Sequence, residues 1–181
     1  MEFQTGDIIC VNGDSLFKSI IGWFSRSHNE PKTYAKHIAG LKDNETVSEA
    51  VWTVKETPIH EWDMSHKQFE VWRKKDISEN DKIIIYDYLN SKHGNIYGGW
   101  KLFLFASDFL LTKILRKRKD VYLFRKLGFI EDFPICSWLY AYAYDNIGYR
   151  FGGYEPNRID PDTMRDKMLK SDEWEMIYKK G

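Results

Sequence analysis

The sequence has little cysteine and no excess of charge of either sign. Its two cysteines, Cys10 and Cys136, are too few for a disulfide framework, although one bridge between them is an alternative. Its 27 basic and 27 acidic residues balance, so no overall field would hold a nucleic-acid backbone, and no nucleic-acid partner is predicted. A secretory signal with its basic and apolar segments is also lacking, which leads us to expect a cytoplasmic protein.

The sequence also lacks the motifs of common metal and phosphate sites. It contains neither a closely spaced pair of cysteines nor a His-Glu-x-x-His helix motif. Tyr97-Gly-Gly-Trp100 lacks the glycine and lysine spacing of a phosphate-binding loop. No cofactor and no metal are therefore predicted.

What is present suits a globular α+β fold. Hydrophobic residues make up 43% of the 181 residues, enough for a continuous core. No internal repeat, low-complexity tract or Pro/Gly-rich linker divides residues 1–181. We therefore expect a single α+β domain, and the sequence makes no prediction of an oligomeric state.

Local patterns predict both strands and helices. A β-branched segment predicts a first strand at 7–11, and four further segments predict an antiparallel meander at 36–41, 46–54, 59–62 and 68–73. A last strand is expected at 174–178. Apolar spacing and capping residues predict helices at 15–24, 83–90 (after Ser78-Glu-Asn-Asp81), 97–115 and 132–146, and another from Asp160-Pro161-Asp162.

Cys136 is the candidate nucleophile. Asp132 and Pro134 predict that a helix begins just before it, so its sulfur lies near backbone N–H groups that have no partner within the helix. Such a position lowers a cysteine pKa below its usual value of about 8.5, and the same N–H groups would stabilise an oxyanion. The alternative interpretation is that Cys136 is a small buried apolar residue.

His37 is the predicted base among the five histidines. His37, Ala39 and Leu41 share one face of the strand predicted at 36–41, which holds the ring on a rigid element beside apolar side chains. His60, also expected on a strand, is the strongest competitor. Solvated or structural positions better explain His60 as well as the remaining three, His28, His66 and His93.

Glu49 is the predicted third member of the site, from the register of a hairpin. If Leu41 pairs with Glu45 around a Lys42-Asp43-Asn44 loop, His37 lies opposite Glu49, with Cβ atoms about 5 Å apart. A carboxylate there would fix the imidazole tautomer, whereas a slip by one residue would turn Glu49 to the other face. The alternative is a solvated glutamate on an exposed face. Cysteine, histidine and glutamate together provide what nucleophilic acyl transfer requires.

Six motifs lie along the chain: Gly6-Asp-Ile-Ile9, Lys36-His-Ile-Ala-Gly-Leu41, Val47-Ser-Glu-Ala50, Phe133-Pro-Ile-Cys-Ser137, Tyr140-Ala-Tyr-Ala-Tyr144 and Asp160-Pro-Asp162. Together they resemble the circularly permuted NlpC-type papain-like cysteine hydrolases, particularly their YiiX-like branch. The resemblance covers nearly the whole chain and implies a small antiparallel sheet or half-barrel packed against helices. It also implies Cys136 as nucleophile, His37 as general base and Glu49 as the polar third residue.

An apolar segment, Trp100 to Leu111, is followed by the basic cluster Arg116-Lys-Arg-Lys119. The apolar run is shorter than the roughly 20 residues that span a bilayer, and Asp108 interrupts it. We expect a helix against the core with a basic C-terminal end. The alternative is contact with a membrane surface through Trp100 to Lys119, with the basic cluster among anionic head groups.

Three functions follow from these patterns. The first is a cysteine hydrolase that cleaves a peptide, amino-acid amide or ester through an acyl-enzyme. The second is a membrane-associated acyltransferase or phospholipase acting on a lipid-like acyl substrate, related to lecithin:retinol acyltransferase, although those relatives more often have a second histidine where this chain has Glu49. The third is a ligand-binding module without catalysis, whose groove would use the aromatic loop Tyr149-Arg-Phe-Gly-Gly-Tyr154.

Overall fold

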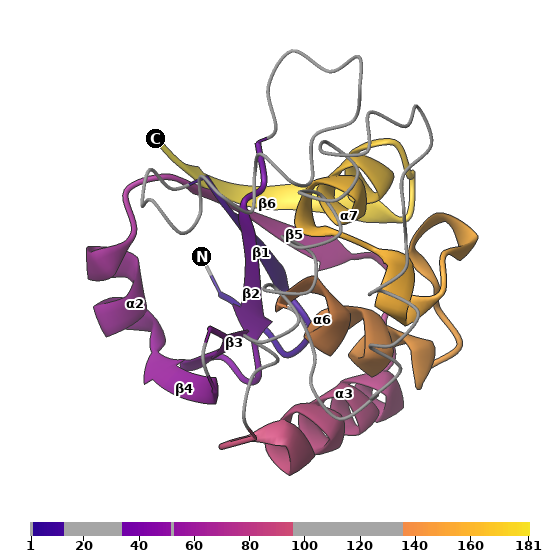
Figure 1. Ribbon diagram of the computed structural model, residues 1–181, viewed down its shortest axis with the longest axis horizontal. Helices are drawn as coiled ribbons and strands as arrows, with labels where there is room; N and C mark the ends of the chain where they lie inside the picture. The colour runs from indigo at the N-terminus through magenta and orange to yellow at the C-terminus, as the bar shows by residue number, and fades with distance from the viewer. Residues whose placement is uncertain (1, 13–33, 52, 96–135) are drawn as a thin grey trace, which may run out of the picture.

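The computed structural model describes residues 2–12, 34–51, 53–95 and 136–181, which form a six-stranded antiparallel sheet and four α-helices (Figure 1). The sheet order is β4-β3-β2-β1-β5-β6. This arrangement confirms the predicted α+β class. The strands are β1 (Ile8–Val11), β2 (His37–Leu41), β3 (Thr46–Ala50), β4 (Val54–Pro58), β5 (Phe69–Lys74) and β6 (Trp174–Lys180).

The predicted meander is correct for β2 and β3, and its segment at 68–73 is the strand β5, but the strand at 59–62 and the place of β5 in the sheet are wrong. Residues 59–62, predicted as a strand, belong to the helix α2 (Ile59–Ser65), and β5 pairs with β1 instead of continuing from β4. A short apolar run does not distinguish strand from helix by itself. Here Ile59 and Trp62, three residues apart, suit one face of a helix, and Trp62 is buried.

The segment predicted as one strand at 46–54 is a hairpin. β3 ends at Ala50, the Val51 N–H donates to the Thr53 carbonyl (3.2 Å), and β4 begins at Val54. No glycine, proline or asparagine marks this turn in the sequence, and β-branched residues continue through it. The sequence pattern therefore does not predict this turn. Because the chain reverses direction here, β4 pairs with β3.

The remaining predicted elements agree with the structure where it describes them. Ser78 and Asp81 form a capping box at the start of α3 (Glu79–Lys92), and Asp160 caps α7 (Pro161–Leu169). Cys136 is the first residue of α6 (Cys136–Asp145), and the last predicted strand is β6. The helices predicted at 15–24 and 97–115, and the first residues of the one at 132–146, lie outside the described residues.

Both faces of the sheet are covered. On one face, α3, α6 and α7 pack against side chains that include Ile8, Cys10 and Ile38. On the other, Trp62 of α2 packs against Ala39 and other strand residues. Figure 1 shows α2 on one side of the strands and α3, α6 and α7 on the other. This double covering buries all residues of β1 and β2 and so holds the site on a rigid element.

Helix α6 lies close to the centre of the sheet because of Gly40. A Cβ atom there would lie 2.7 Å from the Tyr140 ring and 2.6 Å from the Asp7 carbonyl oxygen, which is closer than side chains approach. The Tyr140 hydroxyl donates to the Ser48 carbonyl (2.8 Å), and the Tyr144 hydroxyl donates to the Gly6 carbonyl (2.7 Å). These contacts dock α6, which begins at Cys136, on β2 and β3.

Candidate active site

His37 and Glu49 are in contact, but not by the predicted direct pairing. Glu49 lies opposite Ala39, and a backbone bond from Lys42 to Thr46 (2.9 Å) closes the hairpin loop one residue later than expected. This change moves each pairing partner by two residues, an even number, so Glu49 stays on the predicted face. It reaches His37 diagonally, with 2.9 Å between Nε2 and Oε2.

Lys55 also contacts Glu49, and the sequence reasoning missed it. Its Nζ lies 3.0 Å from Glu49 Oε1, and the two residues are directly opposite each other in the β3–β4 hairpin. A sequence analysis that predicted the β3–β4 hairpin would have placed Lys55 beside Glu49. Burial acts to raise the pKa of Glu49, but the His37 and Lys55 contacts outweigh burial and hold it at about 2. Glu49 is therefore ionised at neutral pH.

Cys136 lies at the start of α6 with no exposed surface, and its thiol hydrogen-bonds with the His37 ring. Burial would raise the pKa of Cys136, but the charge of His37, its hydrogen bond and the backbone N–H groups of Ile38 and Ser137 lower it. Burial likewise opposes the charged form of His37, but Cys136 and Glu49 together raise the pKa of His37 to about 9. The arrangement favours a thiolate–imidazolium pair.

The second thiol has the opposite environment. Cys10 lies in the middle of the sheet on β1, and it is not joined to Cys136 by a disulfide. Burial, together with the nearby Glu70 carboxylate, raises its pKa well above the usual value. Near neutral pH a thiolate signal from this protein would therefore come from Cys136.

The competing histidines lie elsewhere in the fold. His60 is on the helix α2 and not on a strand, and its side chain is 74% exposed near Glu61. The His66 ring stacks on Trp62, with centroids 3.9 Å apart. His93 Nδ1 lies 3.3 Å from a Glu56 oxygen. His28 lies outside the described residues, and the ring that the structure brings to Cys136 is that of His37.

The aromatic loop considered for a ligand groove contributes much of its surface to the core. Tyr149 and Phe151 pack edge to face, with centroids 5.1 Å apart, and both contact Tyr144 and Trp174. The Trp174 ring N–H donates to the Tyr149 hydroxyl (2.7 Å). Of the two tyrosines in the loop, Tyr154 is the more exposed. These rings hold the end of α6 against β6.

Comparisons with known proteins found a structural relative. No family model and no curated protein matches the sequence. The chain does match the crystal structure of the metalloprotein YiiX from Escherichia coli O157:H7, of DUF1105, over 99% of each chain, with a TM-score of 0.61 and 17% identity. This chain has the YiiX fold. The predicted resemblance to the YiiX-like branch of the permuted papain-like hydrolases is thus confirmed at the level of the fold.

The metalloprotein description of YiiX raises the question of a metal in the same fold here. Among the described residues, no three histidine, cysteine, aspartate or glutamate side chains are grouped so as to hold a metal ion. Within the site, Glu49 is already engaged by His37 and Lys55. We therefore assign no metal ligands in this part of the YiiX fold.

None of the helices in the described ranges is long and apolar enough to span a bilayer. Residues 100–119, for which membrane-surface contact was the alternative interpretation, lie outside the described residues. Surface contact through that segment stays a prediction.

Proposed function

We propose that this protein is a cysteine hydrolase that cleaves an amide, peptide or ester bond through a covalent acyl-enzyme. Cys136 is the nucleophile, His37 the general base and acid, and Glu49 the residue that orients His37. The observation that carries the proposal is the continuous contact from the Cys136 thiol through the His37 ring to the Glu49 carboxylate. The YiiX fold supports it as an analogy of architecture.

In the first half-reaction, His37 takes the thiol proton and the Cys136 sulfur forms a bond to the substrate carbonyl carbon. Because Glu49 engages Nε2 of His37, Nδ1 is the nitrogen that receives the proton. The imidazolium then gives this proton to the leaving amine or alcohol as the carbon–nitrogen or carbon–oxygen bond breaks. The acyl group remains on Cys136 as a thioester.

In the second half-reaction, water gives a proton to His37 and its oxygen adds to the thioester carbonyl. The carbon–sulfur bond then breaks, which releases the acid and restores the thiolate–imidazolium pair. In both halves a negative charge develops on the carbonyl oxygen. Backbone N–H groups at the beginning of α6 are suited to stabilise this oxygen, because helix N-terminal amides lack partners within the helix.

The proposed substrates are acyl compounds: a peptide, an amino-acid amide or a lipid-like ester. Among the described residues, the pairing of His37 with Glu49 favours the hydrolase branch over the lipid acyltransferases, which more often use a second histidine. Membrane access through residues 100–119 would instead favour the lipid branch. Flotation with anionic liposomes distinguishes them, because only the lipid branch expects binding.

The proposal is tested by measuring how much of Cys136 is a thiolate at each pH. Ultraviolet thiolate absorbance and iodoacetamide labelling of Cys136 are measured across pH in the wild type, in His37→Ala and in Cys10→Ser. We expect labelling below neutrality to be at least tenfold faster than for an ordinary thiol, and to slow about tenfold or more in His37→Ala, since one pKa unit changes the thiolate fraction about tenfold. Cys10→Ser should leave the labelling unchanged.

A Cys136 that labels no faster than an ordinary thiol, and no slower without His37, would overturn the proposal. Because Cys136 is buried, absorbance reports the thiolate even where labelling is limited by access. Mass spectrometry of the protein with reactive esters and peptide amides then detects the acyl adduct. Ligand binding retained by Cys136→Ala, with no adduct on the wild type, would favour the non-catalytic binding module.

A further inference from the structure

One short segment of the chain contacts the beginnings of both elements that carry the proposed site. Ser137, directly after Cys136, is fully buried and its hydroxyl donates to the Ile159 carbonyl (2.7 Å). Three residues later, Asp162 Oδ1 accepts the backbone N–H groups of Tyr34 (3.0 Å) and Ala35 (3.1 Å). These two residues lead directly into β2, which begins at His37.

The carboxylate of Asp162 is not needed to cap its own helix. Asp160 is the cap of α7, and its side chain accepts the backbone N–H groups of Asp162 and Thr163, each at 3.0 Å, and the Thr163 hydroxyl at 2.6 Å. Asp162 is 6% exposed, so its two bonds to residues 34 and 35 are made away from solvent. The side-chain hydrogen bonds described for Asp162 are therefore made to Tyr34 and Ala35, which precede His37 in the chain.

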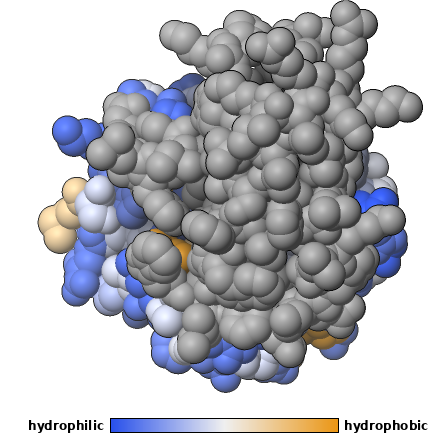
Figure 2. Space-filling view, viewed as in Figure 1, coloured by the Kyte–Doolittle hydropathy of each residue, from blue (hydrophilic) through white to orange (hydrophobic). Residues whose placement is uncertain are grey.

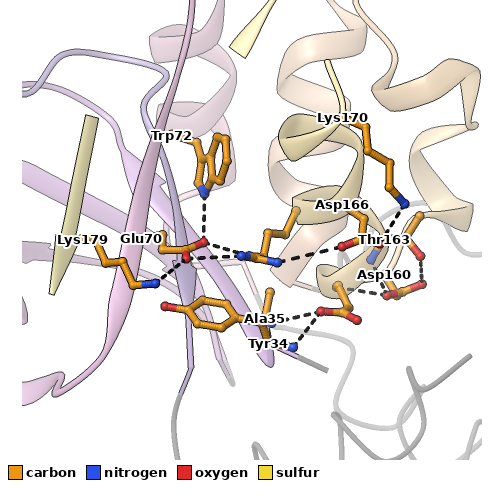
Figure 3. Close-up of polar contacts among 11 residues, drawn as sticks. Tyr34, Ala35, Glu70, Trp72, Asp160, Thr163, Asp166, Lys170 and Lys179 are labelled. Atoms are coloured by element: carbon orange, nitrogen blue, oxygen red, sulfur yellow. Dashed lines mark hydrogen bonds and ion pairs between the residues drawn. The ribbon is translucent and has the colours of Figure 1, made fainter. Parts of the chain in front are cut away.

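A buried ion pair holds α7 on the sheet beside this contact. Arg165 donates to both oxygens of Glu70 on β5, at 2.8 and 3.3 Å, and its guanidinium lies 4.3 Å from the centre of the Tyr34 ring. Lys179 and the Trp72 ring N–H also contact Glu70, each at 3.3 Å. Figure 3 shows Glu70, Tyr34 and Ala35 beside the start of α7. These contacts fix α7, the helix that carries Asp162, against β5.

We propose that Asp162 is a positioning residue that sets the distance between the His37 ring and the Cys136 sulfur. It holds the entry to β2 through the amides of residues 34 and 35, while Ile159, in the same segment, holds α6 through Ser137. Ile159 and Asp162 thus connect the helix of the nucleophile to the strand of the base. This inference rests on the proposed function, because it assigns Asp162 a part in that same site.

The experiment compares Asp162→Ala and Asp162→Asn with the matched control Asp160→Ala. Ultraviolet thiolate absorbance against pH and the pH profile of Cys136 labelling are recorded for each variant, together with its melting temperature. In Asp162→Ala the amides of residues 34 and 35 lose their acceptor, so labelling below neutrality should slow about tenfold, which is one unit in the apparent thiol pKa. Asp162→Asn keeps an acceptor oxygen and should stay within about threefold of the wild type.

The control separates positioning from a general loosening of α7. Asp160→Ala removes the cap of the same helix and should lower the melting temperature while leaving the thiolate titration unchanged. An equal shift in Asp160→Ala and Asp162→Ala, or no shift in Asp162→Ala, would overturn the inference. If Asp162→Ala does not fold, Asp162→Ser replaces it, because serine is too short to reach both amides, and Asp160→Ala stays the control.

The His37→Ala variant keeps the two proposals distinguishable. If removal of His37 leaves the Cys136 titration unchanged, the proposed function itself fails. If His37→Ala shifts the titration and Asp162→Ala does not, only the positioning role fails. A shift in both, with Asp160→Ala unchanged, supports both proposals.

Discussion

At the scale of single residues, the two buried thiols differ in the charge that faces them. Cys10 lies near the Glu70 carboxylate, which adds to burial in raising its pKa. Cys136 lies against the His37 ring and two backbone N–H groups, which lower its pKa despite complete burial. Burial strengthens whichever charge interaction remains, because little water screens it. The environment, more than the residue type, therefore decides which thiol has the lowered pKa.

The contact between Glu49 and His37 leads to a prediction about the base. In Glu49→Gln the negative charge beside the ring is lost, so the pKa of His37 should fall from about 9 by roughly one unit or more. The imidazolium that protonates the leaving group would then be lost at lower pH, and the alkaline limb of any hydrolysis profile should move the same way. NMR titration of the His37 ring measures the shift.

Lys55→Met is the matched control for this variant. Lys55 touches the other oxygen of the same carboxylate and is half exposed, so its removal leaves the charge of Glu49 beside His37. The pKa of His37 should change much less than in Glu49→Gln. A His37 titration that is the same in Glu49→Gln and in the wild type would show that Glu49 does not stabilise the imidazolium.

At the scale of elements, the site depends on how closely one helix approaches one strand. The ring of Tyr140 occupies the space that a side chain at position 40 would need, and its hydroxyl reaches across β2 to the Ser48 carbonyl. Cys136, one helical turn before Tyr140, is carried to His37 by this docking. The position of Cys136 beside His37 therefore depends on the packing of α6 on β2.

Gly40→Ala tests this packing. The added methyl group meets both the Tyr140 ring and the backbone oxygen of Asp7, so α6 must move outward, and we expect a loss of about 1–3 kcal/mol of folding free energy. For a chain of this size that lowers the melting temperature by about 2–4 °C for each kcal/mol. The thiolate absorbance of Cys136 should fall at neutral pH. In a Tyr140→Leu background the cost of Gly40→Ala should be smaller, and an unchanged cost would exclude the ring as its cause.

At the scale of the whole molecule, both faces of the sheet are covered at its centre, where β1 and β2 are buried, while the edge strands β4 and β6 are partly exposed. In Figure 2 the visible part of the described surface is mostly hydrophilic, with a few apolar residues. Charged residues enter the interior mainly in pairs, such as Asp7 with Arg73 and Glu70 with Arg165. The second pair joins the C-terminal helix to β5 and so connects segments 95 residues apart in the sequence.

The buried pair predicts an asymmetric response to mutation. Arg165→Met leaves the Glu70 charge buried with only the half-exposed Lys179 and the Trp72 N–H, and should cost about 3–5 kcal/mol of unfolding free energy. The double variant Glu70→Gln and Arg165→Met should cost less than Arg165→Met alone, because no unpaired charge remains. Urea denaturation measures both.

Arg150→Met provides the comparison at the surface. Arg150 forms exposed ion pairs with Asp145 and Glu155, and such pairs stabilise proteins little. Its unfolding midpoint should stay close to that of the wild type. A double variant at positions 70 and 165 as unstable as Arg165→Met alone would show that packing, and not the unpaired charge, accounts for the loss.

The sequence by itself determined the features that depend on neighbouring residues. Turn residues bounded β1 and β2, Ser78 and Asp81 marked the start of α3, and Asp160 marked α7, because caps and turns are local hydrogen-bonding patterns. The same local reasoning placed Cys136 at the beginning of its helix and His37 on its strand. It failed at 59–62, where a short apolar run suited two structures, and at 51–53, where the turn has no marker residue.

Only the tertiary structure decided which of these elements meet. The contact of His37 with Glu49 required a register that differed by two residues from the expected one, and that of Lys55 with Glu49 required an unforeseen hairpin. Cys136 and His37 are 99 positions apart, and Asp162 holds residues more than 120 positions before it. Such contacts arise from the packing of whole helices and strands. The free energy of this packing depends on many side chains that are far apart in the sequence, so no local pattern predicts it.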